Sequence, residues 1–218
     1  GMDVLTHATE AYTSNFANDY TDGIALQTIK LVFQYLEKSV LTGDPEAREK
    51  IHNASTMAGM AFANAFLGMS HSMAHKIGGR FHTVHGRTNA ILLPYVIRYN
   101  GTRPSKTTTW PKYNYWKADE KFQDIARMLG LPHSTPEEAV AAYAKAVYEL
   151  GEKVGIKMNF KDQGIDEQEW KKYTHELALL AYEDQCSPAN PRLPMVADME
   201  EIMNDAYYGY KERPGRIK

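Results

Sequence analysis

Apolar residues recur every three or four positions along most of the chain, which is the spacing of amphipathic helices. Such intervals separate Ile24, Thr28, Leu31, Val32, Tyr35 and Leu36. No run of four or more residues alternates between apolar and polar side chains clearly enough to predict a β-strand. Further helices are expected over 3–12, 86–99 and 198–208.

Several expected helices begin with a residue that can cap the first turn. Asp44 precedes Pro45, which suits the first position of a helix. Thr135 and Asp166 each open a segment of capping-box form, with a glutamate three positions later. Caps and periodicity together predict an all-α bundle of about seven to nine helices.

Two stretches between the caps carry further expectations. The helix that starts after Asp44 becomes rich in small and apolar residues over 57–63, which indicates burial on most of its sides. We expect Gly78 and Gly79 to break this element in a turn. The stretch 101–117 is expected to form a long surface loop, with aromatic side chains that need packing partners: Trp110, Tyr113, Tyr115 and Trp116.

Composition narrows the class of protein. A net charge of −2 over 218 residues gives no long-range attraction to nucleic acid or to an anionic membrane. The longest apolar stretches, such as 90–96, fall far short of the roughly 20 residues that a membrane span requires. Cys186 is the single cysteine, which excludes an internal disulfide and suits a reducing compartment. We therefore expect a soluble, cytoplasmic globular protein.

Histidines stand at helical spacing from one another and from an aspartate. Two pairs are four positions apart, so each pair shares one face of a helix, and two more histidines follow. These residues are Asp3 with His7, His71 with His75, and then His82 and His85. Imidazoles together with a carboxylate suit a borderline divalent ion such as Fe²⁺ or Zn²⁺.

Spacing alone leaves simpler explanations open. Asp3 and His7 also fit a solvated contact between neighbouring turns, and His71 or His75 also fits a hydrogen-bonded histidine of the core. His82 also fits a loop residue. The remaining histidines stand in charged or polar surroundings typical of structural or exposed positions: His52, His133 and His175. The residues by themselves indicate a metal site without identifying it.

Sequence motifs around these histidines resemble a known family. Residues 1–12 (GMDVLTHATEAY) resemble the start of the C-terminal domain of the iron-containing alcohol dehydrogenases, and 71–86 resembles the family's second signature. Three more segments are similar to the alcohol dehydrogenase part of the bifunctional acetaldehyde/alcohol dehydrogenases in this family: 62–68, 184–192 and 207–209. The resemblance implies an all-helical bundle like the C-terminal domain of dehydroquinate synthase.

The resemblance also implies roles for particular side chains. In the family one aspartate and three histidines hold the metal, and the matching positions are Asp3, His7, His71 and His85. His75 matches a position beside the substrate that is implicated in proton transfer. Phe62 and Cys186 match positions near the alcohol pocket, whereas His82 has no ligand counterpart.

The implied activity is the interconversion of acetaldehyde and ethanol, or similar primary alcohols. NAD would carry the hydride, and Fe²⁺ would act as a Lewis acid, a role that Zn²⁺ also fits. The sequence contains no strand followed by a glycine-rich turn and a helix, so the nucleotide-binding domain and its cofactor-binding residues are missing. Because the chain begins two residues before Asp3, we expect 1–218 to be a single metal-binding domain of a larger enzyme, inactive alone.

The subgroup resemblance carries two expectations about the whole enzyme. It would also have acetaldehyde dehydrogenase activity, and it would form homo-oligomers, since bifunctional relatives assemble into filaments. Two other classes stay open from the residues. One is a helical assembly module without catalysis. The other is a different metal-dependent enzyme, such as a hydrolase, although no clear second carboxylate base stands near the histidines.

Overall fold

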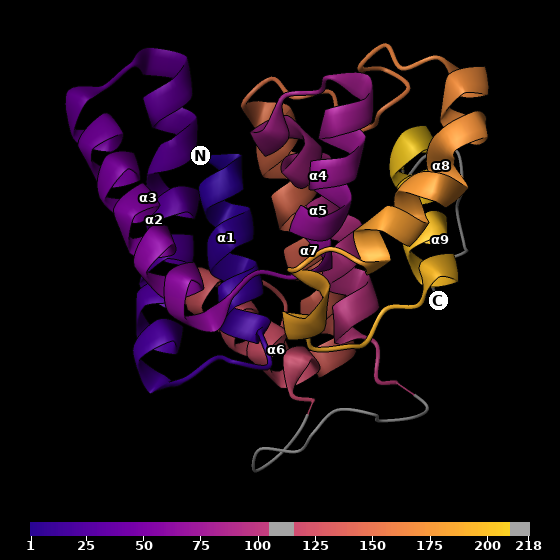
Figure 1. Ribbon diagram of the computed structural model, residues 1–218. Helices are drawn as coiled ribbons and strands as arrows, with labels where there is room; N and C mark the ends of the chain where they lie inside the picture. Colours follow the sequence, from indigo (N-terminus) through magenta and orange to yellow (C-terminus); the bar gives the residue numbers. More distant parts are fainter. Residues whose placement is uncertain (105–115, 210–218) are drawn as a thin grey trace.

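The computed structural model describes residues 1–104 and 116–209, which form a bundle of helices (Figure 1). Nine α-helices and no strand occur in this part of the chain, which confirms the predicted all-α fold. The helices are α1 (Met2–Thr13), α2 (Asp19–Thr42), α3 (Pro45–Ala65), α4 (Met69–Phe81), α5 (His85–Gly101), α6 (Ala118–Leu129), α7 (Pro136–Lys153), α8 (Glu167–Tyr182) and α9 (Val196–Tyr208). A short 3₁₀ turn, Ser187–Ala189, lies between α8 and α9.

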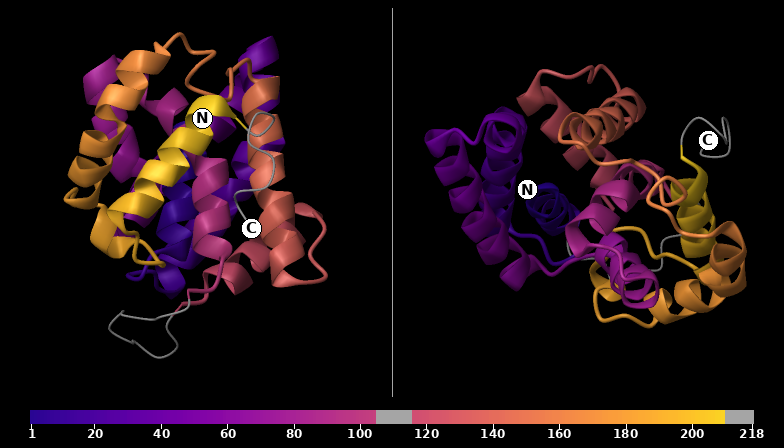
Figure 2. Two further views of the ribbon diagram at one scale, coloured as in Figure 1. Left: turned by 90° about the vertical axis from the view of Figure 1, so that its right-hand side faces the viewer. Right: turned by 90° about the horizontal axis from the view of Figure 1, so that it is seen from above.

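Helix α5 lies in the middle of the molecule, since every residue from Thr88 to Ile97 is buried. One face of α5, with Leu93 and Ile97, joins an apolar cluster shared with α1, α2, α3, α6 and α7. The other face, with Ile91 and Tyr95, joins a second cluster shared with α4, α8 and α9. Figure 2 shows α1 between the α2–α3 pair and α5, so α1 is enclosed by helices as well.

The predicted helix starts are confirmed by hydrogen bonds of their caps. The Asp44 carboxylate accepts from Ala47 N at 2.9 Å, at the start of α3. The Thr135 hydroxyl accepts from Glu138 N at 3.2 Å, at the start of α7. The Asp166 carboxylate accepts from two backbone N–H groups of α8, at 2.9 and 3.0 Å. Each cap satisfies donors that the first helical turn leaves unpaired.

The predicted break at Gly78 and Gly79 is wrong. Helix α4 continues through both glycines to Phe81 and ends at His82, whose φ of 54° is left-handed. A glycine inside a helix costs roughly 0.5–1 kcal/mol relative to alanine. Burial of Ile77 and the packing of α4 against α5 and α8 outweigh that cost.

The chain breaks earlier, at 66–68, between α3 and α4. Phe66 has a φ of 62°, and its N–H donates to Phe62 O as α3 ends. A Cβ at Gly68 would lie 2.7 Å from Asn190 Oδ1 and 3.1 Å from Glu10 Oε1, so this close approach requires glycine. The break sets the start of α4 against α1, and these two helices carry most of the candidate ligands.

The expected loop over 101–117 begins within the last turn of α5, and residues 105–115 lie outside the described part of the chain. Trp110, Tyr113 and Tyr115 are among them. Trp116 packs against the first apolar cluster, so this aromatic side chain has the packing partners that were expected for it. None of the described helices is both long and apolar enough to cross a membrane.

Candidate metal centre

Helix α1 places three functional side chains along one face. Asp3, His7 and Glu10 follow one another at intervals of four and three residues, so they form a row over two helical turns. The His7 ring stacks on Phe62 of α3, with ring centroids 4.6 Å apart and planes at 28°. On its other side it lies 4.6 Å from the ring of His71, with planes at 17°. This sandwich fixes the orientation of His7.

The carboxylate of Asp3 is the point where three imidazoles meet. Its Oδ1 lies 3.7 Å from His71 Nε2 of α4 and 3.6 Å from His85 Nε2 of α5. Its Oδ2 lies 3.9 Å from Nε2 of His7. Donor atoms of Asp3, His7 and His71 therefore all lie within 4.8 Å of one another. His85 approaches this group at Asp3, and its side chain is 46% exposed. The assignment of these four residues to a metal stays a prediction.

Glu10 explains why His71 presents Nε2 to this centre. Glu10 Oε2 lies 2.5 Å from His71 Nδ1, and Glu10 Oε1 accepts from Ser70 N at 2.7 Å. An ionised carboxylate only accepts, so Nδ1 carries the proton and Nε2 carries the lone pair. That buried Nε2 has no hydrogen-bond partner among the described residues. A carboxylate behind one ring nitrogen and a bare lone pair on the other is the usual setting of a metal-binding histidine.

Desolvation lowers the pKa of two of the imidazoles. Desolvation, with the neighbouring imidazole of His71, lowers the pKa of His7 to about 4 even though Asp3 and Glu10 oppose it. Burial also lowers the pKa of His85, again against the opposing effect of Asp3. Neutral imidazole is the form that binds a metal ion, so the lone pairs are available at neutral pH. The donor set and its protonation fit a divalent first-row ion.

Asn89 completes the surroundings of Asp3. Its Nδ2 donates to Asp3 Oδ1 at 2.9 Å and lies 3.2 Å from His85 Nε2. Its own Oδ1 accepts from Ser70 Oγ at 3.1 Å. The sequence analysis singled out neither Asn89 nor Glu10. The available signal was position, since Asn89 stands one turn after His85 and Glu10 stands one turn after His7.

His75 lies beside this centre with a separate partner. Its ring stacks against that of His85 at 5.6 Å and 13°, and lies 6.1 Å from that of His71. Its Nδ1 lies 3.1 Å from Asp184 Oδ2 rather than facing Asp3. The structure therefore places His75 next to the four converging residues and outside their donor set.

The two residues expected near a substrate pocket border the same region. Phe62 stacks on His7 and is half-buried. Cys186 is buried, and its Sγ belongs to a group with donor atoms of His75 and Asp184 that lie within 4.8 Å of one another. Burial, together with the charge of Asp184, raises the pKa of the Cys186 thiol to about 12. The Cys186 thiol is therefore neutral, and it lacks the thiolate form that a nucleophile needs.

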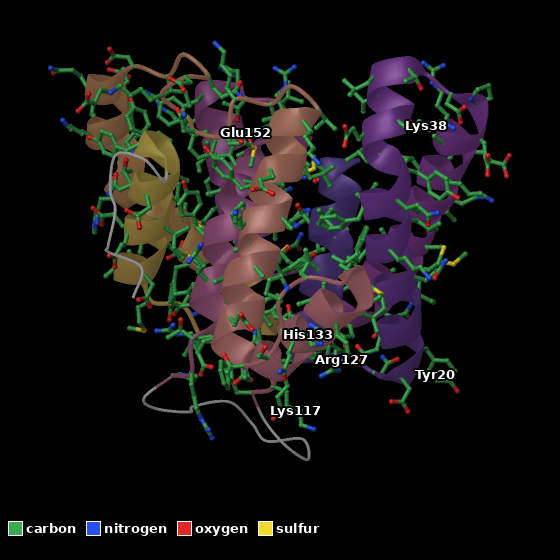
Figure 3. All side chains as sticks on the ribbon, turned by 180° about the vertical axis from the view of Figure 1, so that it is seen from behind. Tyr20, Lys38, Lys117, Arg127, His133 and Glu152 are labelled. Carbon is green, nitrogen blue, oxygen red and sulfur yellow. The ribbon has the colours of Figure 1, made fainter. Side chains whose placement is uncertain are left out.

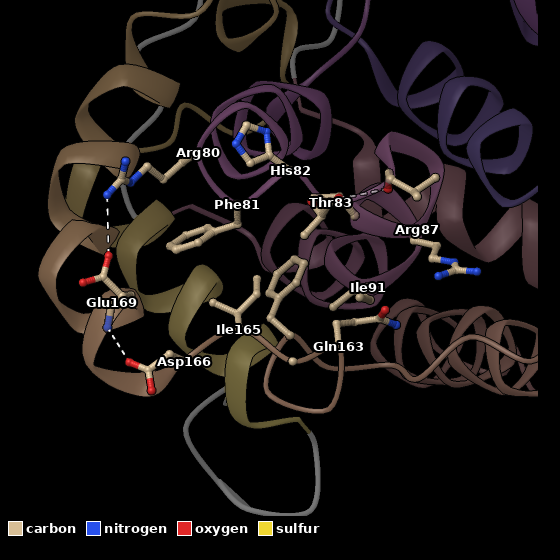
Figure 4. A pocket seen from close by; sticks show the side chains of 14 residues that line it. Arg80, Phe81, His82, Thr83, Arg87, Ile91, Gln163, Ile165, Asp166 and Glu169 are labelled. Carbon is tan, nitrogen blue, oxygen red and sulfur yellow. Dashed lines mark hydrogen bonds and ion pairs between the residues drawn. The ribbon is translucent and has the colours of Figure 1, made fainter.

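The remaining histidines lie away from the centre. His52 and His175 are exposed, and His133 Nδ1 lies 2.7 Å from Leu131 O at the back of the molecule (Figure 3). His82 lines a separate cavity of about 490 Å³ with Arg80, Phe81 and other residues (Figure 4). The exposure of His52 and His175 agrees with the surroundings that the sequence predicts for them.

Residues 1–207 match the model of the Fe-containing alcohol dehydrogenase family, C-terminal part. The chain belongs to this family. Its full length is 79% identical to the aldehyde-alcohol dehydrogenase of Streptococcus pneumoniae serotype 2 (strain D39 / NCTC 7466), of which it covers 25%. The chain thus spans about a quarter of the length of this curated relative.

Solved structures share the fold. A crystal structure of 1,3-propanediol oxidoreductase superposes with a TM-score of 0.82 at 35% identity, over 94% of this chain and 50% of that one. The sulfoacetaldehyde reductase of Bifidobacterium kashiwanohense, solved in complex with NAD⁺, gives 0.75 at 25% identity, over 94% of this chain and 48% of that one. Both structures share the all-helical architecture that the sequence predicts.

Proposed function

We propose that residues 1–218 are one all-helical, metal- and substrate-binding domain of an iron-dependent, NAD-linked alcohol dehydrogenase. The enzyme would interconvert acetaldehyde and ethanol or similar small primary alcohols. One observation carries the proposal: the buried Nε2 of His71 has no hydrogen-bond partner among the described residues and lies 3.7 Å from Asp3 Oδ1. An imidazole buried in this state is costly unless a ligand completes it.

The metal would be held by Asp3, His7, His71 and His85. Three imidazoles and one carboxylate suit Fe²⁺, the ion of the family, and Zn²⁺ fits the same donors. Such an ion supplies Lewis acidity toward an oxygen atom of the substrate. Glu10 and Asn89 hold the donors in position through their hydrogen bonds.

The chain's own residues would bind the alcohol and move its proton. His75 is one-third exposed beside the ligands, so its Nε2 can take up the proton that the hydroxyl group loses during oxidation. It returns the proton when the aldehyde is reduced. Phe62 and the neutral Cys186 thiol would border the alkyl group. NAD⁺, when bound by the rest of the enzyme, would supply the acceptor for the hydride that leaves the carbinol carbon.

The remainder of the enzyme would supply the cofactor site. We propose that a nucleotide-binding domain precedes this one, which agrees with the coverage of about half of the sulfoacetaldehyde reductase that binds NAD⁺. The coverage of a quarter of an aldehyde-alcohol dehydrogenase favours a still longer, bifunctional protein with acetaldehyde dehydrogenase activity. Its compartment would be the cytoplasm, and self-association into oligomers or filaments would be a property of this longer protein.

The test uses the full-length enzyme, purified without oxygen, loaded with Fe²⁺ and assayed for ethanol-dependent reduction of NAD⁺. We expect His71→Ala to lose both iron and activity, whereas the matched surface variant His52→Ala keeps both. Residues 1–218 alone should not bind NAD⁺ at micromolar concentration, because the proposed nucleotide-binding domain is missing. They should not oxidise ethanol either, since positioning the hydride donor and acceptor lowers the reaction barrier by roughly 7–11 kcal/mol.

Three results would contradict the proposal. Full activity in enzyme free of any metal ion would exclude the metal role. Metal binding with hydrolysis in place of alcohol oxidation would favour a different metalloenzyme. An enzyme in which His71→Ala changes only the oligomeric state would favour an assembly module.

A further inference from the structure

The His75 ring is held from behind by a carboxylate far away in the sequence. Asp184 Oδ2 lies 3.1 Å from His75 Nδ1, although 109 positions separate the two residues. Asp184 follows α8 directly, where the chain turns toward the 3₁₀ turn Ser187–Ala189. The fold therefore brings this carboxylate to the Nδ1 side of the imidazole.

Asp184 is itself held on both oxygens. Its Oδ1 accepts from Cys186 N at 3.0 Å, and its Oδ2 also lies 2.9 Å from Lys76 Nζ. Its backbone is fixed as well, since Asp184 N donates to Ala181 O at 3.2 Å. The side chain is 7% exposed. These contacts hold the carboxylate in place independently of His75. The carboxylate can therefore orient the His75 ring.

A fixed carboxylate determines which ring nitrogen of His75 carries the proton. Because an ionised carboxylate only accepts hydrogen bonds, His75 Nδ1 must donate. The neutral ring then has its lone pair on Nε2, at the other side of the ring. The stack on His85 at 5.6 Å and 13° sets the plane of the ring. Tautomer and plane are thus both determined before any substrate arrives.

We propose that Asp184 is the positioning residue of His75, and that Lys76 anchors this carboxylate without taking part in proton transfer. The inference rests on the proposed function, in which His75 Nε2 exchanges a proton with the alcohol. It assigns a role to two residues that the sequence analysis did not single out. Asp184 acts through His75, so its loss should affect turnover rather than binding of the alcohol.

The same atoms also resemble the donor set of a second metal site, and two observations argue against one. Donor atoms of His75, Asp184 and Cys186 lie within 4.8 Å of one another. However, the ammonium group of Lys76 lies 2.9 Å from Asp184 Oδ2, where a cation would have to bind. The raised pKa of Cys186, about 12, also keeps the thiol protonated, whereas metal binding needs the thiolate. The group is an ion-paired support for His75.

Asparagine at position 184 separates the roles of the two oxygens. An amide offers one acceptor oxygen and one donor NH₂ group. In Asp184→Asn the amide can accept from Cys186 N or from His75 Nδ1, and it cannot accept from both. If the amide oxygen stays on Cys186 N, the NH₂ group faces His75 Nδ1 and favours the opposite tautomer. The Nε2 lone pair is then lost.

The experiment compares three variants of the full-length enzyme: Asp184→Asn, Lys76→Met and the double variant. Asp184→Asn leaves Lys76 without its anion, so a loss of stability alone could lower activity. The double variant removes both charges, so neither member of the ion pair is left without its partner. Asp198→Asn is the matched control, because Asp198 Oδ2 likewise accepts two hydrogen bonds, from Tyr99 Oη at 2.9 Å and Met195 N at 2.8 Å.

We expect kcat to fall about 10–100-fold in both variants that lack the Asp184 carboxylate, the range typical of a partner behind a functional histidine. KM for ethanol and bound iron should stay at the wild-type values. Asp198→Asn should keep kcat near the wild-type value. Lys76→Met should lower kcat less than Asp184→Asn does, because Cys186 N still donates to the carboxylate. A crystal structure of the double variant should show the His75 ring turned away from its wild-type orientation.

Other results overturn the inference. If kcat follows thermal stability across the three variants and recovers in the double variant, Asp184 is only structural. An unchanged kcat in Asp184→Asn, or loss of iron, also contradicts a positioning role through His75. The proposed function is tested separately by His75→Ala. Loss of turnover in that variant with normal kcat in Asp184→Asn would reject the inference and leave the proposed function intact.

Discussion

Glu10 and His71 form a contact in which both side chains are almost fully buried, at 3% and 1% exposure, with 2.5 Å between Oε2 and Nδ1. The second oxygen of Glu10 accepts from Ser70 N at 2.7 Å. The carboxylate therefore satisfies two N–H groups from α4 at once. It also forces the His71 lone pair toward Asp3, so this pair links the packing of α1 on α4 to the chemistry of the centre.

Glu10→Gln should weaken metal binding, because an amide has a single acceptor oxygen for two N–H donors. Loss of a carboxylate behind a metal-binding histidine typically costs 10–100-fold in metal affinity. Competition titration with a metal indicator, in the full-length enzyme, measures this change. Glu169→Gln is the control, since Glu169 is exposed on α8. Equal affinities for the two variants would mean that Glu10 does not orient His71.

Glycine at position 68 should be required, whereas glycine at position 59 should not. Alanine at Gly68 would press its Cβ against Asn190 Oδ1 at 2.7 Å and Glu10 Oε1 at 3.1 Å, both of which are held by hydrogen bonds. Such overpacking costs about 1–3 kcal/mol. A Cβ at Gly59, inside α3, meets nothing within 4 Å. Gly59→Ala should therefore stabilise the chain by roughly 0.5–1 kcal/mol.

Urea unfolding of the two alanine variants tests this pair. The opposite signs of the two changes are the diagnostic result. A Gly68→Ala variant as stable as the wild type would show that the start of α4 can move away from α1. The description of the break at 66–68 would then be wrong.

The helices could be predicted from the sequence where their causes are local. The caps at Asp44, Thr135 and Asp166 act within one turn, and each marks the start that the structure has. The break at Gly68 depends on Asn190, more than 120 positions away, so no local pattern announced it. The pair Gly78–Gly79 looked like a break because glycine has a low helix propensity, and tertiary packing overrode that preference.

The candidate site divides in the same way. Helical spacing and resemblance indicated Asp3, His7, His71 and His85, which the fold then brings to one point. Glu10 is a partner of His71 across 61 positions, and Asp184 is a partner of His75 across 109. Such supporting residues follow from how α1, α4 and the segment after α8 pack. Spacing along one helix contains no information on that packing.

Trp170→Ala should be among the most destabilising single substitutions. Trp170 is fully buried and stacks on Phe81, Phe160 and Tyr207, with ring centroids 4.9–5.6 Å apart. Truncation of such a residue costs about 3–5 kcal/mol. Tyr20→Ala is the control, because Tyr20 is 84% exposed at the surface (Figure 3) and should change stability by less than about 0.5 kcal/mol. Chemical denaturation monitored by circular dichroism distinguishes the two.

Asp184 should also make stability depend on pH in the acid range. Although burial raises the pKa of Asp184, hydrogen bonds from Lys76, Cys186 N and His75 outweigh burial and lower the value from 3.8 to about 2. The unfolded chain therefore binds more protons between these values. The contribution of Asp184 to the free energy of unfolding is complete above pH 3.8 and is lost as the pH falls to about 2.

Urea unfolding at several pH values from 5 to 2 checks this dependence. The wild-type chain should lose more stability over this interval than the Lys76→Met/Asp184→Asn double variant, which lacks the titrating carboxylate. Parallel curves for the two proteins would show that Asp184 has an ordinary pKa in the folded state.

We propose that one divalent ion is held by Asp3, His7, His71 and His85. Anomalous diffraction at the iron edge, from crystals of the full-length enzyme prepared without oxygen with Fe²⁺, tests it most directly. We predict one peak in this domain, about 2.0–2.2 Å from Nε2 of each of the three histidines and from one oxygen of Asp3. A peak held instead by His75, Asp184 and Cys186, or no peak near Asp3, would contradict the account.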